Sequence, residues 1–180
     1  MDELSSAQTA LTALQRVVHR IADDDLGRPT PCPAFDVAAL TDHLVDFISR
    51  LGESIGVHVS TPDGGTLEQR ILQIARLVLV GWRQRGLAGD VVFSGRTLPA
   101  RLAVGVLSLE LIVHGWDFAV ATDQRLGVSD AHADYVLELA HQTLTPQSRI
   151  TVGFDKPAPV PDDASGLDRL VAFTGRKPGL

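Results

Sequence analysis

Three ionisable residues interrupt a long apolar stretch of the chain. Between Leu102 and Ala121 nearly every side chain is apolar, yet Glu110, His114 and Asp117 occur within the run. If the stretch is a helix, each residue turns it by about 100°, and the three side chains share one face. A carboxylate left unpaired in an apolar interior would be strongly destabilising, so a partner must compensate it.

A fourth ionisable residue, His43, lies on the apolar stripe of a second expected helix and should point inward. Glu110 and His114 form Glu-x-x-x-His, a spacing that lets one helix present two ligands to one ion, and His43 would add a third. Two imidazoles and a carboxylate with an open position suit a catalytic Zn²⁺, with Ni²⁺, Mn²⁺ and Fe²⁺ as alternatives. Asp117 is then expected to accept the ring N–H of a ligand.

A simpler interpretation stays open beside this one. A buried ion pair between Glu110 and His114, with Asp117 solvated at the helix end, accounts for the same residues without a metal. Four further histidines are expected at the surface or at the boundary of the core rather than at an ion: His19, His58, His132 and His141.

Apolar periodicity predicts four helices that would position these residues. Their expected ranges are 5–24, 36–52, 66–85 and 99–121. We expect Ser5 or Ser6 to cap the first helix and Asp36 to cap the second. Pro99 stands where a helix tolerates proline best, at its start. The connections are a proline-rich extended linker at 27–33, a loop at 60–65 and a segment with a short strand at 89–99. Four helices of this length joined by irregular loops indicate a bundle.

The remaining residues form a shorter segment. We expect a helix capped by Asp130 and ending near Leu144, an edge strand at 149–154, and a short helix at 167–173 stopped by Gly175. The chain is therefore divided into a metal-binding four-helix bundle, residues 1–125, and a C-terminal tail, residues 126–180. The tail is too short for an independent domain and should pack on the bundle. The predicted fold class is mainly all-α, with a small C-terminal α/β appendage.

Charge and composition exclude several classes of protein. The chain has 16 Lys and Arg against 22 Asp and Glu, a net charge of −6, so it lacks the basic stripe that nucleic acids require. Its single cysteine, Cys32, permits no intramolecular disulfide, and the acidic N-terminus does not resemble a secretory signal. The apolar run has membrane-spanning length, but its ionisable residues favour a buried helix. We therefore expect a cytoplasmic protein with no nucleic-acid or membrane partner.

Three sequence blocks carry a resemblance to a known family. The blocks TPCPAFDVAALTDHL (30–44), ELIVHGWDFAVATDQ (110–124) and LDRLVAFTGRKP (167–178) together resemble actinobacterial proteins built on the metal-binding domain of mycothiol-dependent maleylpyruvate isomerase, within the DinB-like superfamily. The resemblance implies a four-helix bundle that holds one divalent ion, commonly zinc. Carried over to this chain, the ion falls on His43, Glu110 and His114.

The same resemblance implies a class of chemistry but no individual substrate. The family's isomerase has a larger C-terminal domain that helps to bind the thiol, whereas this sequence resembles the short-tailed type, so maleylpyruvate isomerisation itself is not expected. The implied function is a transferase or isomerase that uses a low-molecular-weight thiol such as mycothiol on a small electrophile. The ion would bind the thiol as thiolate and lower its pKa. The alternative is a non-catalytic ligand-binding or stress-response bundle. Family bundles often pair, so a homodimer is also considered.

Four other residues were considered for the site. Cys32, between two prolines, is either a redox-sensitive thiol near the mouth of the bundle or, as we favour, a small residue that fills the turn. Trp116 is interpreted as core packing rather than as a wall for substrate. Arg169 and Arg176 are interpreted as partners of Asp168 and solvent, and no site role is assigned to them.

Overall fold

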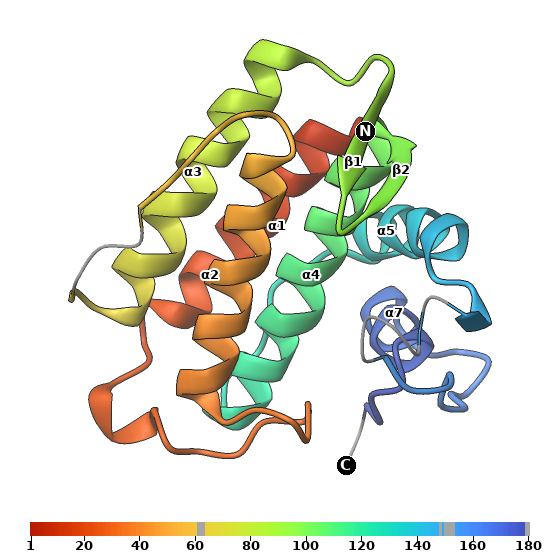
Figure 1. Ribbon diagram of the computed structural model, residues 1–180. Helices are drawn as coiled ribbons and strands as arrows, with labels where there is room; N and C mark the ends of the chain where they lie inside the picture. The colour runs from red at the N-terminus through yellow and green to blue at the C-terminus, as the bar shows by residue number, and fades with distance from the viewer. Residues whose placement is uncertain (61–63, 148, 150–153, 179–180) are drawn as a thin grey trace.

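The computed structural model describes residues 1–60, 64–147, 149 and 154–178. Four long helices dominate the fold, as Figure 1 shows. They are α1 (Glu3–Val18), α2 (Val37–Glu53), α3 (Leu67–Arg85) and α4 (Ala100–Ala121). Their apolar faces meet in one core. The mainly α-helical class predicted from the periodicity is confirmed.

The helix starts show which sequence signals decided the local structure. Asp36 accepts from the backbone N–H of Ala39, and Thr66 with Gln69 forms a capping box, so α2 and α3 begin where the sequence indicates. The prediction for α1 was wrong at both ends. Asp2, not a serine, caps it, and the helix stops at Val18 because the acidic stretch that follows forms a separate turn, η1 (Asp23–Asp25).

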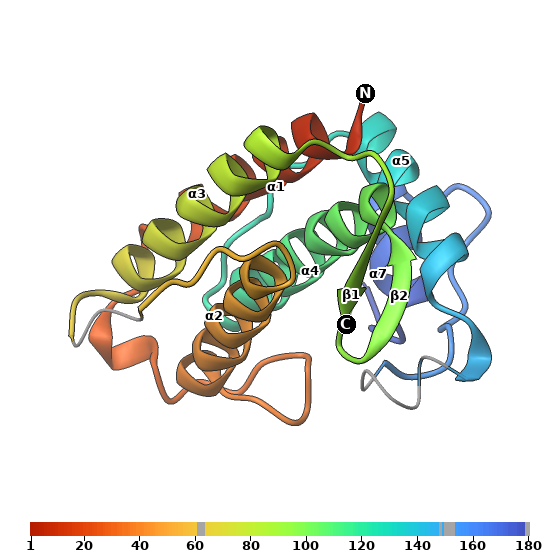
Figure 2. The same cartoon turned by 45° about the horizontal axis from the view of Figure 1, so that its top comes forward.

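Helix α4 lies at the centre of the protein and is buried on nearly every side. It contacts α1 and α2 on one side and α5 (Asp130–Thr143) and α7 (Gly166–Phe173) on the other, as Figure 2 shows. It is long and apolar enough to cross a membrane, yet 83% of its most apolar window is buried inside the protein. This burial is typical of the core helix of a soluble protein.

A β-hairpin precedes α4, where the sequence predicts only one short strand. Strand β1 (Asp90–Phe93) pairs with β2 (Arg96–Pro99) in antiparallel register, and Ser94 and Gly95 form the turn with φ of 50° and 74°. Two successive positive φ values fit a tight hairpin turn, for which Gly is favoured. Phe93 places its ring 5.5 Å from that of Phe47 on α2, edge to face.

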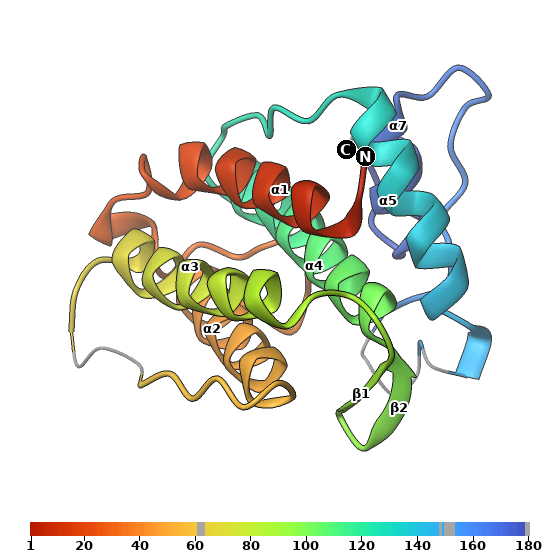
Figure 3. The ribbon, with the colours of Figure 1, turned by 90° about the horizontal axis from the view of Figure 1, so that it is seen from above.

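The C-terminal helices pack beside α4, on its side away from α2 and α3 (Figure 3). Ser129 caps α5, so the expectation that Asp130 would do so was wrong by one residue. Asp130 instead accepts from the backbone N–H of Gly166 at the start of α7, which joins the two helices. The strand expected at 149–154 lies, apart from its two end residues, outside the described residues. The division into two parts at residue 125 stays a prediction.

Candidate metal centre

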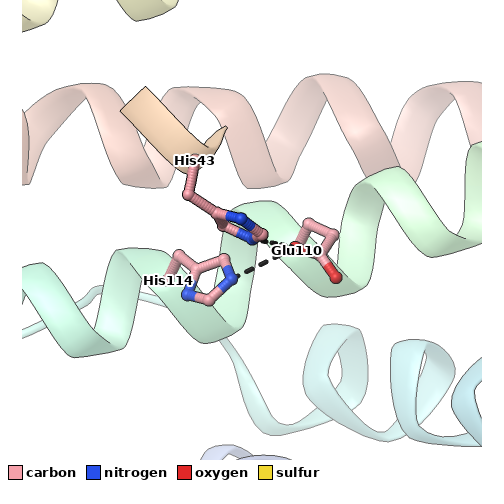
Figure 4. Close-up of side chains that lie close together, drawn as sticks. All are labelled: His43, Glu110 and His114. Atoms are coloured by element: carbon pink, nitrogen blue, oxygen red, sulfur yellow. Dashed lines mark ion pairs between the residues drawn. The ribbon is translucent and has the colours of Figure 1, made fainter. Parts of the chain in front are cut away.

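Three side chains from two helices converge between α2 and α4. Figure 4 shows His43 and His114 directed at the carboxylate of Glu110. The Nε2 atoms of His114 and His43 lie 3.1 Å and 3.6 Å from Glu110 Oε2, and one ligand atom from each residue lies within 4.8 Å of the others. Ligands of one tetrahedral zinc stand roughly 3.4 Å apart, from bond lengths of about 2.1 Å, so small side-chain movements would bring all three onto one ion.

Aromatic packing fixes the less buried of the two imidazoles. The ring of His43 stacks on Phe35 with centroids 4.9 Å apart, and its edge meets the ring of His114 at 5.0 Å. Phe35 precedes the capping residue Asp36, so the loop that starts α2 also holds the ring. The side chain of His43 is 29% exposed, against 8% for Glu110, so the centre has a buried end and a more open end.

A second carboxylate determines which nitrogen of His114 faces Glu110. Asp117 Oδ2 lies 2.9 Å from His114 Nδ1, and Asp117 is fully buried. An ionised carboxylate can only accept, so Nδ1 must carry a proton and donate it to Asp117. This leaves Nε2 on the side of Glu110, which is the orientation a metal ligand needs.

Arg176, from the C-terminal tail, completes this chain of contacts. Its Nη2 and Nε donate to the two oxygens of Asp117 at 2.7 Å and 3.2 Å, and the residue is 6% exposed. A guanidinium paired in this two-point geometry compensates the buried carboxylate. The interpretation of Arg176 as a solvent-facing residue was therefore wrong.

The charges of the centre shift its pKa values strongly. Burial alone would raise the pKa of Glu110, but its contacts with His114 and His43 outweigh this and lower it to about 2. Burial likewise would lower the pKa of His114, yet Asp117 and Glu110 raise it to about 9. Without an ion, His114 is therefore a protonated imidazole between two carboxylates.

The residues present could hold a divalent cation. In the part of the chain that the structure describes, the buried Glu110 Oε2 has no hydrogen-bond donor, although the ring nitrogens of His114 and His43 lie 3.1 Å and 3.6 Å away. A buried charged oxygen without a donor is costly and needs an explanation. Two imidazole nitrogens and a carboxylate oxygen form a donor set that Zn²⁺ and similar ions prefer.

The other residues considered from the sequence have different surroundings. Cys32 is half-buried and is not among the three converging ligands, although Arg176, Asp117 and Glu110 act on its pKa, which burial raises. His132 was expected near the surface, but it is buried and bonds Ser6 Oγ through Nε2 at 2.9 Å. Both Ser6–His132 and Asp117–Arg176 join residues far apart in the chain, a relation that local sequence patterns do not contain.

Comparisons with known proteins support the resemblance over part of the chain. Residues 7–69 match the model of the family described as the mycothiol maleylpyruvate isomerase N-terminal domain. The predicted resemblance is thereby confirmed over α1, α2 and the start of α3. The match includes His43 but stops before Glu110 and His114, so the pair on α4 rests on its geometry.

Full-length similarity extends to proteins that have no assigned activity. The chain is 27% identical over 184 residues to an uncharacterized protein of Mycobacterium tuberculosis strain CDC 1551 / Oshkosh, with 98% of each chain covered. An uncharacterized protein of strain ATCC 25618 / H37Rv matches equally well. No solved structure matches the chain significantly.

Proposed function

We propose that His43, Glu110 and His114 bind one divalent cation, with Zn²⁺ favoured. The observation that carries the proposal is the buried Glu110 Oε2, which faces two imidazole nitrogens and has no hydrogen-bond donor among the residues that the structure describes. Ni²⁺, Mn²⁺ and Fe²⁺ accept the same donor set and remain alternatives. Three protein ligands leave an open position, as in catalytic rather than structural zinc sites.

We further propose that the protein is a thiol-dependent transferase or isomerase acting on a small electrophile, with mycothiol or a similar compound as the thiol. The family match at residues 7–69 supports this class. A divalent ion in the site would supply a Lewis acid that stabilises a bound thiol as thiolate at neutral pH.

The protein's own residues supply orientation and charge. Asp117 keeps the proton of His114 on Nδ1, and Arg176 keeps Asp117 ionised and directed at that nitrogen. The stacking of Phe35 holds the His43 ring at the more open end, where a small molecule would enter. These fixed contacts reduce the reorganisation needed when a ligand binds.

The metal content of protein purified without an affinity tag tests the first part of the proposal. We expect about one divalent ion per chain, and a lower melting temperature after EDTA treatment, since an ion that binds only the folded state stabilises it. A protein without bound metal and with an unchanged melting temperature in EDTA would instead support the plain Glu110–His114 ion pair.

Thiol chemistry tests the second part separately. The metal-loaded protein should consume mycothiol or a simpler thiol faster when small electrophiles are added, and His43→Ala should abolish the acceleration. Bound metal without any thiol consumption would favour the non-catalytic bundle. We place the protein in the cytoplasm, where such thiols are reduced, and leave a homodimer as a further proposal that sedimentation velocity would decide.

A further inference from the structure

A cleft of about 930 Å³ opens beside the metal centre. Its walls come from the loop before α2, the C-terminal half of α4 with the loop that follows it, and the C-terminal tail. Pro31, Trp116, Val120 and Leu167 give it an apolar surface, and its volume lies in the range of small-molecule sites, about 300–1,000 Å³. Trp116 packs against the core, as the sequence predicts, and also borders this cleft.

The cleft is separate from the candidate metal ligands. None of His43, Glu110 and His114 is among its lining residues. Arg176 forms the wall between them, because it lines the cleft and donates to Asp117 behind it. A ligand in the cleft would lie one pair of side chains away from His114.

Some of the charged side chains that line the cleft have an ion-pair or hydrogen-bond partner in the described part of the chain, and others have none. Arg176 is paired with Asp117, and Asp168 accepts from Ser165 Oγ at the cap of α7. In the part of the chain that the structure describes, Arg125 and Lys177 line the cleft, are exposed and form no ion pair. Of the lining carboxylates, Asp155 and Asp168 have no ion pair among the described residues, and only Asp155 also has no side-chain hydrogen bond there. Two cations with no described partner thus face one carboxylate with no described partner, Asp155, and one that is hydrogen-bonded to Ser165 at the N-terminus of α7, Asp168.

We infer that this cleft binds a small organic anion with a flat, apolar body. Trp116 and the prolines provide surfaces on which a ring can stack, and Arg125 and Lys177 provide the cations for a carboxylate, sulfonate or phosphate group at the rim. A ligand with a cationic group would meet these two unpaired positive charges, with Asp155 as the one carboxylate that has no described partner and Asp168 already hydrogen-bonded to Ser165. The site goes beyond the proposed metal-dependent chemistry and does not require it.

Two matched compounds test the inference on the full chain. Naphthalene-2-sulfonate carries the anion, and naphthalene-2-sulfonamide has nearly the same shape without charge. We expect calorimetric titration at low ionic strength to give a dissociation constant for the sulfonate at least about five-fold lower than for the sulfonamide, since two partly exposed ion pairs each contribute a few-fold. The difference should be the same in metal-loaded and EDTA-treated protein, so a failure of the metal assignment would leave this result intact.

Substitutions locate the binding. The double substitution Arg125→Glu and Lys177→Glu should weaken sulfonate binding more than ten-fold and sulfonamide binding little, and Asp155→Asn should strengthen sulfonate binding two- to three-fold. Arg96→Glu changes an exposed arginine on the hairpin, outside the cleft, and is the control that should have no effect. Equal affinities for the two compounds, no binding of either, or equal effects of the cleft and control substitutions would overturn the inference.

Discussion

Two buried histidines illustrate how differently one protein uses the same side chain. His114 lies between two carboxylates, and its pKa is raised to about 9. His132 is equally buried, but its described partner is the neutral hydroxyl of Ser6, and burial lowers its pKa. The first environment concentrates charge and leaves Glu110 Oε2 without a hydrogen-bond donor among the described residues, whereas the second is a neutral hydrogen bond between α1 and α5. Burial of a histidine alone therefore does not indicate a metal site.

Loss of a proposed metal ligand should distinguish the charged site around His114 most clearly from the neutral Ser6–His132 contact. His43→Ala removes one of three donors while leaving α2 intact, because this side chain is partly exposed. We expect metal affinity to fall by at least about 100-fold, measured by competition with a chelator, since a site with two ligands holds a divalent ion poorly. His132→Ala is the matched control and should retain its metal. Equal metal content in wild type and His43→Ala would refute the assignment.

Removing Arg176, which pairs with Asp117 at the charged site, should destabilise the protein more than a substitution at the neutral Ser6–His132 contact. Arg176→Met leaves Asp117 buried with only one cationic partner, and we expect the free energy of unfolding to fall by about 3 kcal/mol. Metal affinity should fall roughly ten-fold as His114 loses its fixed orientation. Urea denaturation and chelator competition measure the two effects.

The control for Arg176 is another arginine of the same tail. Arg169→Met breaks an ion pair with Asp134 whose two side chains are 38% and 47% exposed, so the loss should stay below about 1 kcal/mol. If the two substitutions destabilise the protein equally, the Asp117–Arg176 contact has no special role.

A substitution in the neutral Ser6–His132 pair should lower the stability of the protein and leave its metal content unchanged. Ser6→Ala removes the hydroxyl that meets His132 Nε2 and should lower the free energy of unfolding by about 1–2 kcal/mol. Metal content should not change. Ser5→Ala alters an exposed neighbour and should have little effect on either property. Metal loss in Ser6→Ala would show that the two sites are coupled.

Lowering the pH should destabilise wild type more than a variant in which the titratable His132 is replaced. The folded-state pKa of His132 lies below 6.5, so the unfolded chain binds more protons, and wild type loses stability as the pH falls below that unfolded value. His132→Gln should lack this pH-dependent loss. As the pH falls below 6.5, the free energy of unfolding of wild type should therefore fall relative to that of His132→Gln, by less than about 1.4 kcal/mol per pH unit. A difference independent of pH below 6.5 would contradict the neutral assignment.

Local patterns in the sequence identified the three residues that the structure brings together, His43, Glu110 and His114, and their role as metal ligands stays a prediction. The i, i+4 spacing of Glu110 and His114 and the stripe position of His43 are properties of single helices, and caps such as Asp36 mark where those helices begin. The start of α1 was predicted wrongly because more than one residue near it could cap the helix. Ser6 was available as a cap, but Asp2 caps α1 and Ser6 bonds His132 instead.

Partners from distant segments were beyond the reach of local patterns. Asp117 and Arg176 are 59 residues apart, and the pattern around Arg176 gives no sign that its guanidinium is buried. Charge compensation could have indicated that a further cation is needed, since the two negative charges of Glu110 and Asp117 are more than one protonated histidine can neutralise. It could not have identified the residue that meets it.

The position of α4 also constrains how the chain acquires its structure during synthesis. The helix is completed at residue 121, but part of its apolar surface is covered only by α5 and α7, which are made later. A nascent chain released before α7 would carry that surface uncovered, and exposed apolar helices associate readily with chaperones or with one another. Shortened chains that keep every proposed metal ligand but lack α5 and α7 should therefore aggregate, so these two later helices protect the central helix from association.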